Sequence, residues 1–128
     1  MSLWIFKCYC SEAGRDLIDP WYLDLPVKAQ AKLDKLLEHF RDNPHHKWGG
    51  NYLQPLVGYE GIFEIKFQML NVVYRPLGYF GPERRDFTFL IGAREQGDAF
   101  VPVDAPDRAV ERRETVRRNG DRAHECDF

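Results

Sequence analysis

The stretch YEGIFEIKFQMLNVVYRPLGYF, residues 59–80, decides the fold of this chain. Its first part, residues 59–67, has period two, so that successive side chains point to opposite faces of a strand. Gly61, Phe63, Ile65 and Phe67 share one face, and Ile62, Glu64 and Lys66 take the other. Residues 68–71 form a turn, and residues 72–80 return as a second strand. A short connection between consecutive strands predicts an antiparallel hairpin.

The strand pattern extends on both sides of this hairpin. After the turn at Gly81-Pro82, residues 86–93 form a third strand, which makes the segment an antiparallel meander. Near the beginning of the chain, residues 3–10 are rich in aromatic and β-favouring side chains and predict an opening strand. Four strands in one sheet are therefore expected.

Helices are predicted between the opening strand and the meander, and again after it. Ser11 caps a short helix that Pro20 ends, and Pro26 opens a second helix that stops at Asn43-Pro44. A stripe of apolar residues at helical spacing indicates that the second helix packs on the sheet: Ala29, Leu33, Leu36, Leu37 and Phe40. Pro106 opens a last, arginine-rich helix, which ends near Asn119-Gly120.

The order of these elements predicts an α+β protein with a small antiparallel sheet. We expect the two N-terminal helices on one face of the sheet, with the C-terminal helix following it. The chain has 128 residues, enough for one ordinary domain. We expect residues 1–118 to form this domain and residues 119–128 to be a polar tail, in which residues 121–128 are frayed.

Composition narrows the class of protein. Hydrophobic residues make up 44% and charged residues 30%, which is typical of a globular protein. No apolar run approaches the roughly 18–20 residues that span a bilayer, and no secretion signal is recognised, so no membrane partner is expected. The three cysteines, Cys8, Cys10 and Cys126, form no disulfide framework, which favours a reducing cytoplasm. The net charge of −2 lacks the basic surplus of typical nucleic-acid binders.

The sequence lacks the motifs that several kinds of catalytic and cofactor site require. The two serines and two threonines stand in no G-x-S-x-G context, which excludes a typical serine hydrolase. There is no glycine-rich phosphate loop, so no nucleotide cofactor is expected. His45 and His46 are adjacent and lack the spacing of a metal site, so no metal is expected either.

The meander and its flanks resemble the RelE/HigB-type toxins of bacterial toxin–antitoxin pairs. Residues 55–56 and 59–67 are similar to the toxin segment K-x-L…G-L-Y-E-L-R, and VYRPLGYF (73–80) is similar to the next strand, Y-R-x-x-Y-F. FLIGARE (89–95) resembles L-L-H-G-F-x-K-K, and the helix at Pro106 is similar to T-P…E-I-E-x-A-x-x-R. The resemblance covers nearly the whole chain, in order, and is closest to the phage-associated HigB-like branch. It implies a RelE/ParE-like fold.

The resemblance also implies a function. Such a toxin binds the ribosome and, without metal or cofactor, cuts messenger RNA, which inhibits translation; a cognate antitoxin neutralises it. The RNA 2′-hydroxyl attacks the neighbouring phosphate, and this needs a proton acceptor, a proton donor and cations around the transition state.

Three family positions correspond to Lys66, Arg75 and Arg94 of this chain. They follow or lie on adjacent predicted strands, so we expect the three cations to converge on one phosphate. Arginine suits bidentate contacts to phosphate oxygens, and lysine acts as a point charge. The tyrosine or histidine that transfers protons in many family members has no counterpart, since the nearest ring is Phe100, and the general base is unassigned.

Two alternatives use the same scaffold without RNA cleavage. One is a protein-binding toxin of the ParE branch, which poisons gyrase, and the other is a degenerate member retained for antitoxin or phage-protein binding. A basic pocket between the sheet and the last helix would favour the nuclease. A charge-balanced face in which Glu64 bonds to both Lys66 and Arg75, as in an ordinary cross-strand ion pair, would favour the alternatives.

Overall fold

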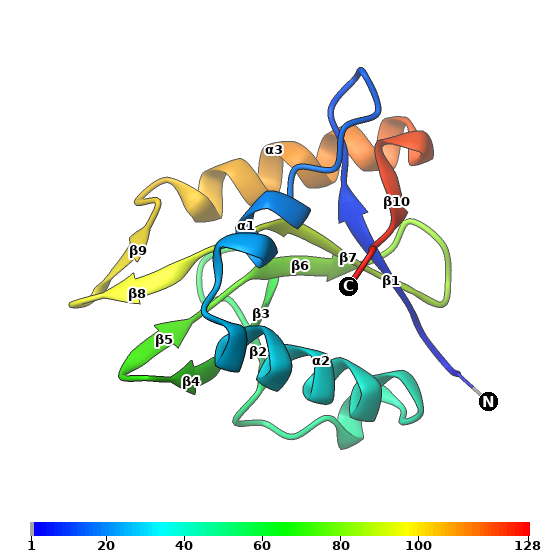
Figure 1. Cartoon of the computed structure of the whole chain (residues 1–128). Helices are drawn as coiled ribbons and strands as arrows, with labels where there is room; N and C mark the ends of the chain where they lie inside the picture. Colours follow the sequence, from blue (N-terminus) through cyan, green and yellow to red (C-terminus); the bar gives the residue numbers. More distant parts are fainter. Residues whose placement is uncertain (1) are drawn as a thin grey trace.

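The computed structural model describes residues 2–128, which form helices and short strands in an α+β arrangement (Figure 1). The helices are α1 (Asp19–Asp24), α2 (Val27–Arg41) and α3 (Ala105–Arg118), with 3-10 turns η1 (His45–Lys47) and η2 (Gly120–Arg122). The strands are β1 (Ile5–Tyr9), β2 (Leu53–Pro55), β3 (Phe63–Ile65), β4 (Phe67–Met69), β5 (Val72–Tyr74), β6 (Leu77–Phe80), β7 (Asp86–Ile91), β8 (Arg94–Gln96), β9 (Ala99–Val101) and β10 (Ala123–Glu125). None of the helices in these residues has the length and apolar character needed to cross a bilayer.

The predicted meander is confirmed, but its first two strands are each divided between two sheets, and its third strand is followed by a separate strand in the second sheet. The first sheet has the order β10-β1-β7-β6-β3-β2, and the second has the order β4-β5-β8-β9. The hairpin keeps one register across the break, with Phe63 opposite Gly78 and Phe67 opposite Tyr74. One strand is interrupted at Arg75-Pro76, where proline has no N–H to donate to a neighbouring strand.

The opening strand departs from the antiparallel prediction. β1 pairs in parallel with β7, and β10 pairs antiparallel with the other edge of β1. The chain from β1 to the meander passes through α1 and α2, which provides the long crossover that a parallel pair needs. The sheet is therefore mixed.

The core lies on both faces of the first sheet. All six residues of β7 are buried, as expected for a central strand covered on two sides. Figure 1 shows α1 and α2 on one side of the strands and α3 on the other. The apolar stripe of α2 is buried as predicted at Leu33, Leu37 and Phe40. Buried Ala109 and Val116 come from α3, which contacts β6 and β7.

The first helix lies later in the chain than predicted. α1 begins at Asp19, so Pro20 opens it instead of ending a helix that starts near Ser11. Proline is tolerated in the first turn because the N–H groups there have no intrahelical partner. The Asp16 carboxylate accepts hydrogen bonds from the backbone N–H groups of Ile18 and Asp19, at 2.8 and 2.9 Å. These bonds organise the turn that leads into the helix.

The predictions of a frayed tail and of no disulfide are both wrong. Residues 123–125 form β10, and Cys126 is joined to Cys8 of β1 by a disulfide that links residues 118 positions apart. The Phe128 ring stacks on Tyr22 of α1 at 4.3 Å between centroids. Residues 119–128 are mostly polar, yet they include a strand that pairs with β1 and a cysteine that is bonded to β1.

Gly78 is a position where the packing excludes a side chain. A Cβ atom there would meet the Thr88 carbonyl oxygen and lie 2.6 Å from the ring of Phe87. We expect Gly78→Ala to lower the free energy of unfolding by about 1–3 kcal/mol, the usual cost of overpacking. Gly50→Ala is the matched control, since a Cβ at Gly50 would meet no atom within 4 Å. Urea unfolding of both variants tests this, and equal midpoints would contradict it.

Candidate functional site

Arg75 is held between two carboxylates. It lies directly after β5, where its Nε donates to Glu64 Oε2 at 2.6 Å and its Nη1 donates to Glu95 Oε1 at 3.3 Å. The side chain of Arg75 is 17% exposed, compared with 5% for Glu64 and 30% for Glu95. Glu64 is therefore a buried partner that fixes the guanidinium, and Glu95 is a partner that solvent and ligands can reach.

The β8–β9 hairpin completes the surroundings of Arg75. Glu95 and Phe100 are cross-strand partners in this hairpin, and the Arg75 guanidinium lies 4.1 Å from the centroid of the Phe100 ring. Such a cation–π contact orients the guanidinium plane. Phe100 is therefore a positioning contact for Arg75, a role that the sequence did not suggest. Glu95 was also missed as a site residue, and the only signal for it was its place directly after Arg94.

Lys66 lies on the same side of the hairpin as Arg75. The continuous register places these two residues opposite each other at the break between the sheets. Lys66 donates its backbone N–H to the Tyr52 carbonyl at 2.7 Å and lines a cavity of about 230 Å³. Within residues 2–128, no carboxylate oxygen lies within 4.0 Å of its ammonium group.

Arg94 does not join Lys66 and Arg75, so the predicted convergence of three cations is wrong. Arg94 pairs with Tyr74 of β5, and side chains of cross-strand partners share a face. Arg75 follows Tyr74 and Glu95 follows Arg94, so Arg75 and Glu95 take the opposite face. The sequence predicted Arg94 directly after the third strand, whereas it is the first residue of β8, and the sequence could not give the face on which its side chain lies.

The electrostatics around Arg75 are close to balanced. Glu64 pairs with Arg75 and not with Lys66, so the double ion pair that would favour the non-nuclease alternatives forms only in part. With Glu95 included, two carboxylates offset the charges of Arg75 and Lys66. This face is also more closed than a solvated sheet face, since Glu64 is buried. Because these charges offset one another, long-range electrostatic attraction of a polyanion must come from another surface of the protein.

A polar cavity of about 630 Å³ lies between the end of β1 and the last helix, away from Arg75. It is lined by Tyr9 and α3 residues that include Arg108, Arg112 and Glu111. Burial and the nearby charge of Arg108 lower the pKa of Arg112, whose Nη1 donates to the Leu90 carbonyl at 2.8 Å. This cavity mixes both charges, so it is not the purely basic pocket that would favour a nuclease.

The ring of His45 lies beside aromatic side chains. The ring of His45 lies 4.8 Å from that of Phe80 and 6.0 Å from that of Trp4, at the edge of an aromatic cluster. In the part of the chain that the structure describes, no group of three or more His, Cys, Asp or Glu residues is arranged to hold a metal ion.

Comparisons of the chain with models of protein families, with curated proteins and with solved structures find no match.

Proposed function

We propose that this chain is the toxin of a type II toxin–antitoxin pair, a metal-independent endoribonuclease that cuts messenger RNA at the ribosome. The observation that carries this proposal is the pairing of the Arg75 guanidinium with the partly exposed Glu95 carboxylate at 3.3 Å. RNA cleavage through the 2′-hydroxyl needs both a proton acceptor and a cation beside the phosphate. The ordered motifs of the RelE/HigB-type toxins support the same function.

The proposed reaction uses three side chains. The Glu95 carboxylate takes the proton of the 2′-hydroxyl, whose oxygen attacks the adjacent phosphorus, and Arg75 stabilises the negative charge of the phosphorane. The bond to the 5′-oxygen then breaks, and this oxygen takes a proton from the Lys66 ammonium. The products are a 2′,3′-cyclic phosphate and a 5′-hydroxyl. Exchange with water returns Glu95 and Lys66 to their starting protonation states.

Preorganisation of Arg75 supports its role in this reaction. Glu64 and Glu95 bind Nε and Nη1, while Nη2 has no hydrogen-bond partner within residues 2–128. A guanidinium that two carboxylates hold in place, and whose Nη2 is free to donate, stabilises the negative charge of the transition state without reorganising during the reaction. Glu64 is thus proposed as a positioning residue and Glu95 as the catalytic base. Arg94, which lies on the other face, has no part in this mechanism.

The partners and compartment follow from this proposal. The substrate is messenger RNA on the ribosome, which places the site of action in the cytoplasm, and an antitoxin protein is the expected inhibitor. Cytoplasmic thiols keep most disulfides reduced, so the Cys8–Cys126 bond would open there.

Induced expression in a bacterial host tests the proposal. Wild-type protein should arrest growth and create new messenger RNA 5′ ends inside coding sequences. Arg75→Lys should abolish both effects, because lysine keeps a cation beside buried Glu64 but loses the planar fork that binds phosphate oxygens. Arg84→Lys, at an exposed position, is the control and should behave as wild type. New 5′ ends that persist in Arg75→Lys would contradict the proposal.

The second candidate is a protein-binding module of the ParE kind or a non-catalytic family member. The ion pairs of Arg75 with Glu64 and Glu95 favour it, because they offset the charge that RNA would need to meet. Growth arrest without new 5′ ends, or no arrest at all, would support this candidate instead.

A further inference from the structure

A groove rich in lysine runs between α2 and the edge strand β4. It consists of two cavities of about 550 and 230 Å³ that share Lys32. The first is lined by Lys28, Lys32 and Lys35 of α2 together with Met69. The second reaches Lys66, together with Tyr52 and Gln68. We call this surface, with its four lysines Lys28, Lys32, Lys35 and Lys66, the lysine groove.

Three of the four lysines lie in a row along α2. Lys28, Lys32 and Lys35 are spaced i, i+4 and i+7, which places them on one face of α2 over about 10 Å of helix axis. Among the described residues, no carboxylate oxygen lies within 4.0 Å of any of the four ammonium groups. Lys32 Nζ instead donates to the Gln68 carbonyl at 2.7 Å, which holds it over the edge of β4.

Among residues 2–128, one carboxylate lines the groove, and it already has a hydrogen-bond partner. Asp34 accepts the Tyr22 hydroxyl at 2.7 and 2.9 Å. Burial and this bond raise the pKa of Tyr22 to about 12, so its hydroxyl remains a donor. The lysine groove ends beyond Lys35, where Glu38 and Asp42 line the next hollow. Its other end is Lys66, opposite Arg75.

The lining of the second cavity favours a nucleic acid over an acidic peptide. Tyr52 is 36% exposed, and Asn51 and Gln68 are exposed amides that donate and accept hydrogen bonds. Sites for single-stranded nucleic acid combine a positive groove that follows the backbone with aromatic rings on which bases stack. An acidic peptide would meet the lysines but has no base to place against Tyr52.

We propose that the lysine groove binds the phosphate backbone of single-stranded RNA and guides the strand to Arg75. The second part rests on the proposed nuclease function, whereas binding in the groove does not require cleavage. The groove would supply the attraction that the charge-balanced surroundings of Arg75 lack.

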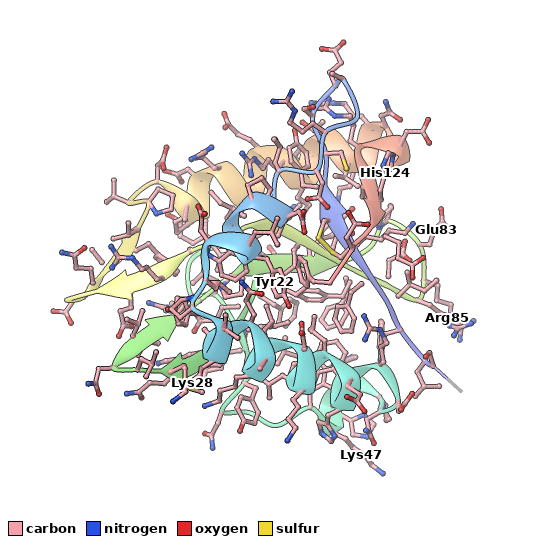
Figure 2. All side chains as sticks on the ribbon, viewed as in Figure 1. Tyr22, Lys28, Lys47, Glu83, Arg85 and His124 are labelled. Carbon is pink, nitrogen blue, oxygen red and sulfur yellow. A yellow bond between two sulfur atoms is a disulfide. The ribbon has the colours of Figure 1, made fainter. Side chains whose placement is uncertain are left out.

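Fluorescence anisotropy of the full chain with a labelled 2′-O-methyl oligouridylate of about 12 nucleotides tests this inference without cleavage. The triple variant Lys28→Gln, Lys32→Gln, Lys35→Gln should bind about ten-fold or more weakly at low salt. The slope of log affinity against log salt concentration should fall by about 2, since three phosphate contacts are lost. Lys47→Gln is a control for the loss of one charge away from the groove, because Lys28 and Lys47 lie at opposite ends of α2 (Figure 2). Circular dichroism verifies that both variants fold.

Each outcome decides the inference. An unchanged affinity or salt slope in the folded triple variant overturns it. Displacement of the RNA by polyglutamate at equal charge concentration also overturns it, in favour of an acidic protein partner. If wild type binds through the groove but cleaves no RNA, the groove stands and the nuclease proposal falls. If wild type cleaves RNA and the triple variant binds it normally, the nuclease stands and the groove falls.

Discussion

Glu95→Gln is expected to lower the rate of RNA cleavage by about 100- to 10,000-fold, the usual contribution of a general base. Glutamine keeps an oxygen that accepts the Nη1 hydrogen bond of Arg75, so the guanidinium stays in place while the proton acceptor is lost. Glu95 is partly exposed, so this replacement should leave the free energy of unfolding within about 0.5 kcal/mol of wild type. Single-turnover cleavage of a labelled RNA by purified protein, on ribosomes supplied in excess, measures the rate.

Two controls separate base catalysis from a change of charge. Glu83→Gln makes the same change at an exposed position beside Arg85, near the β1–β10 edge (Figure 2), and should cleave as wild type. An RNA with a 2′-deoxynucleotide at the cut site should resist cleavage, because its nucleophile is missing. Wild-type rates in Glu95→Gln would assign the base to another group, and cleavage of the deoxy substrate would contradict the 2′-hydroxyl mechanism.

Loss of the Cys8–Cys126 disulfide is expected to have the largest effect on stability. The bond closes a loop with a sequence separation of 118, and a loop of this size contributes about 4–5 kcal/mol through the entropy of the unfolded chain. Cys126→Ser should therefore lower the free energy of unfolding by this amount, a large part of the 5–15 kcal/mol typical of a domain. Urea unfolding under oxidising conditions measures it.

A reducing agent provides the control for this prediction. Dithiothreitol should bring wild type to nearly the stability of Cys126→Ser and should leave the variant unchanged, since both of its remaining cysteines, Cys8 and Cys10, are then free thiols. Equal unfolding midpoints for oxidised and reduced wild type would show that β10 and the packing of Phe128 on Tyr22 hold the C-terminal segment without the bond. The difference between the two midpoints also measures how much stability the protein would lose in any reducing compartment.

Local periodicity determined much of this fold. The alternation in residues 59–67 and the return of residues 72–80 predicted the hairpin, and the spacing of Leu33, Leu37 and Phe40 predicted the buried face of α2. These features depend on neighbours in sequence, because a strand or helix presents its side chains with a set period. The sequence likewise selected Arg75 and Lys66, which do share one side of the hairpin.

Only the tertiary structure decided which distant segments meet. The parallel pairing of β1 with β7, the disulfide to Cys126 and the contact of Arg75 with Glu95 of the β8–β9 hairpin all join segments that are separate in the chain. The face of Arg94 was decided in the same way, since a shift of one residue in register moves a side chain to the other side of a sheet. Pairing between distant segments depends on the packing of the whole chain, which no local pattern encodes.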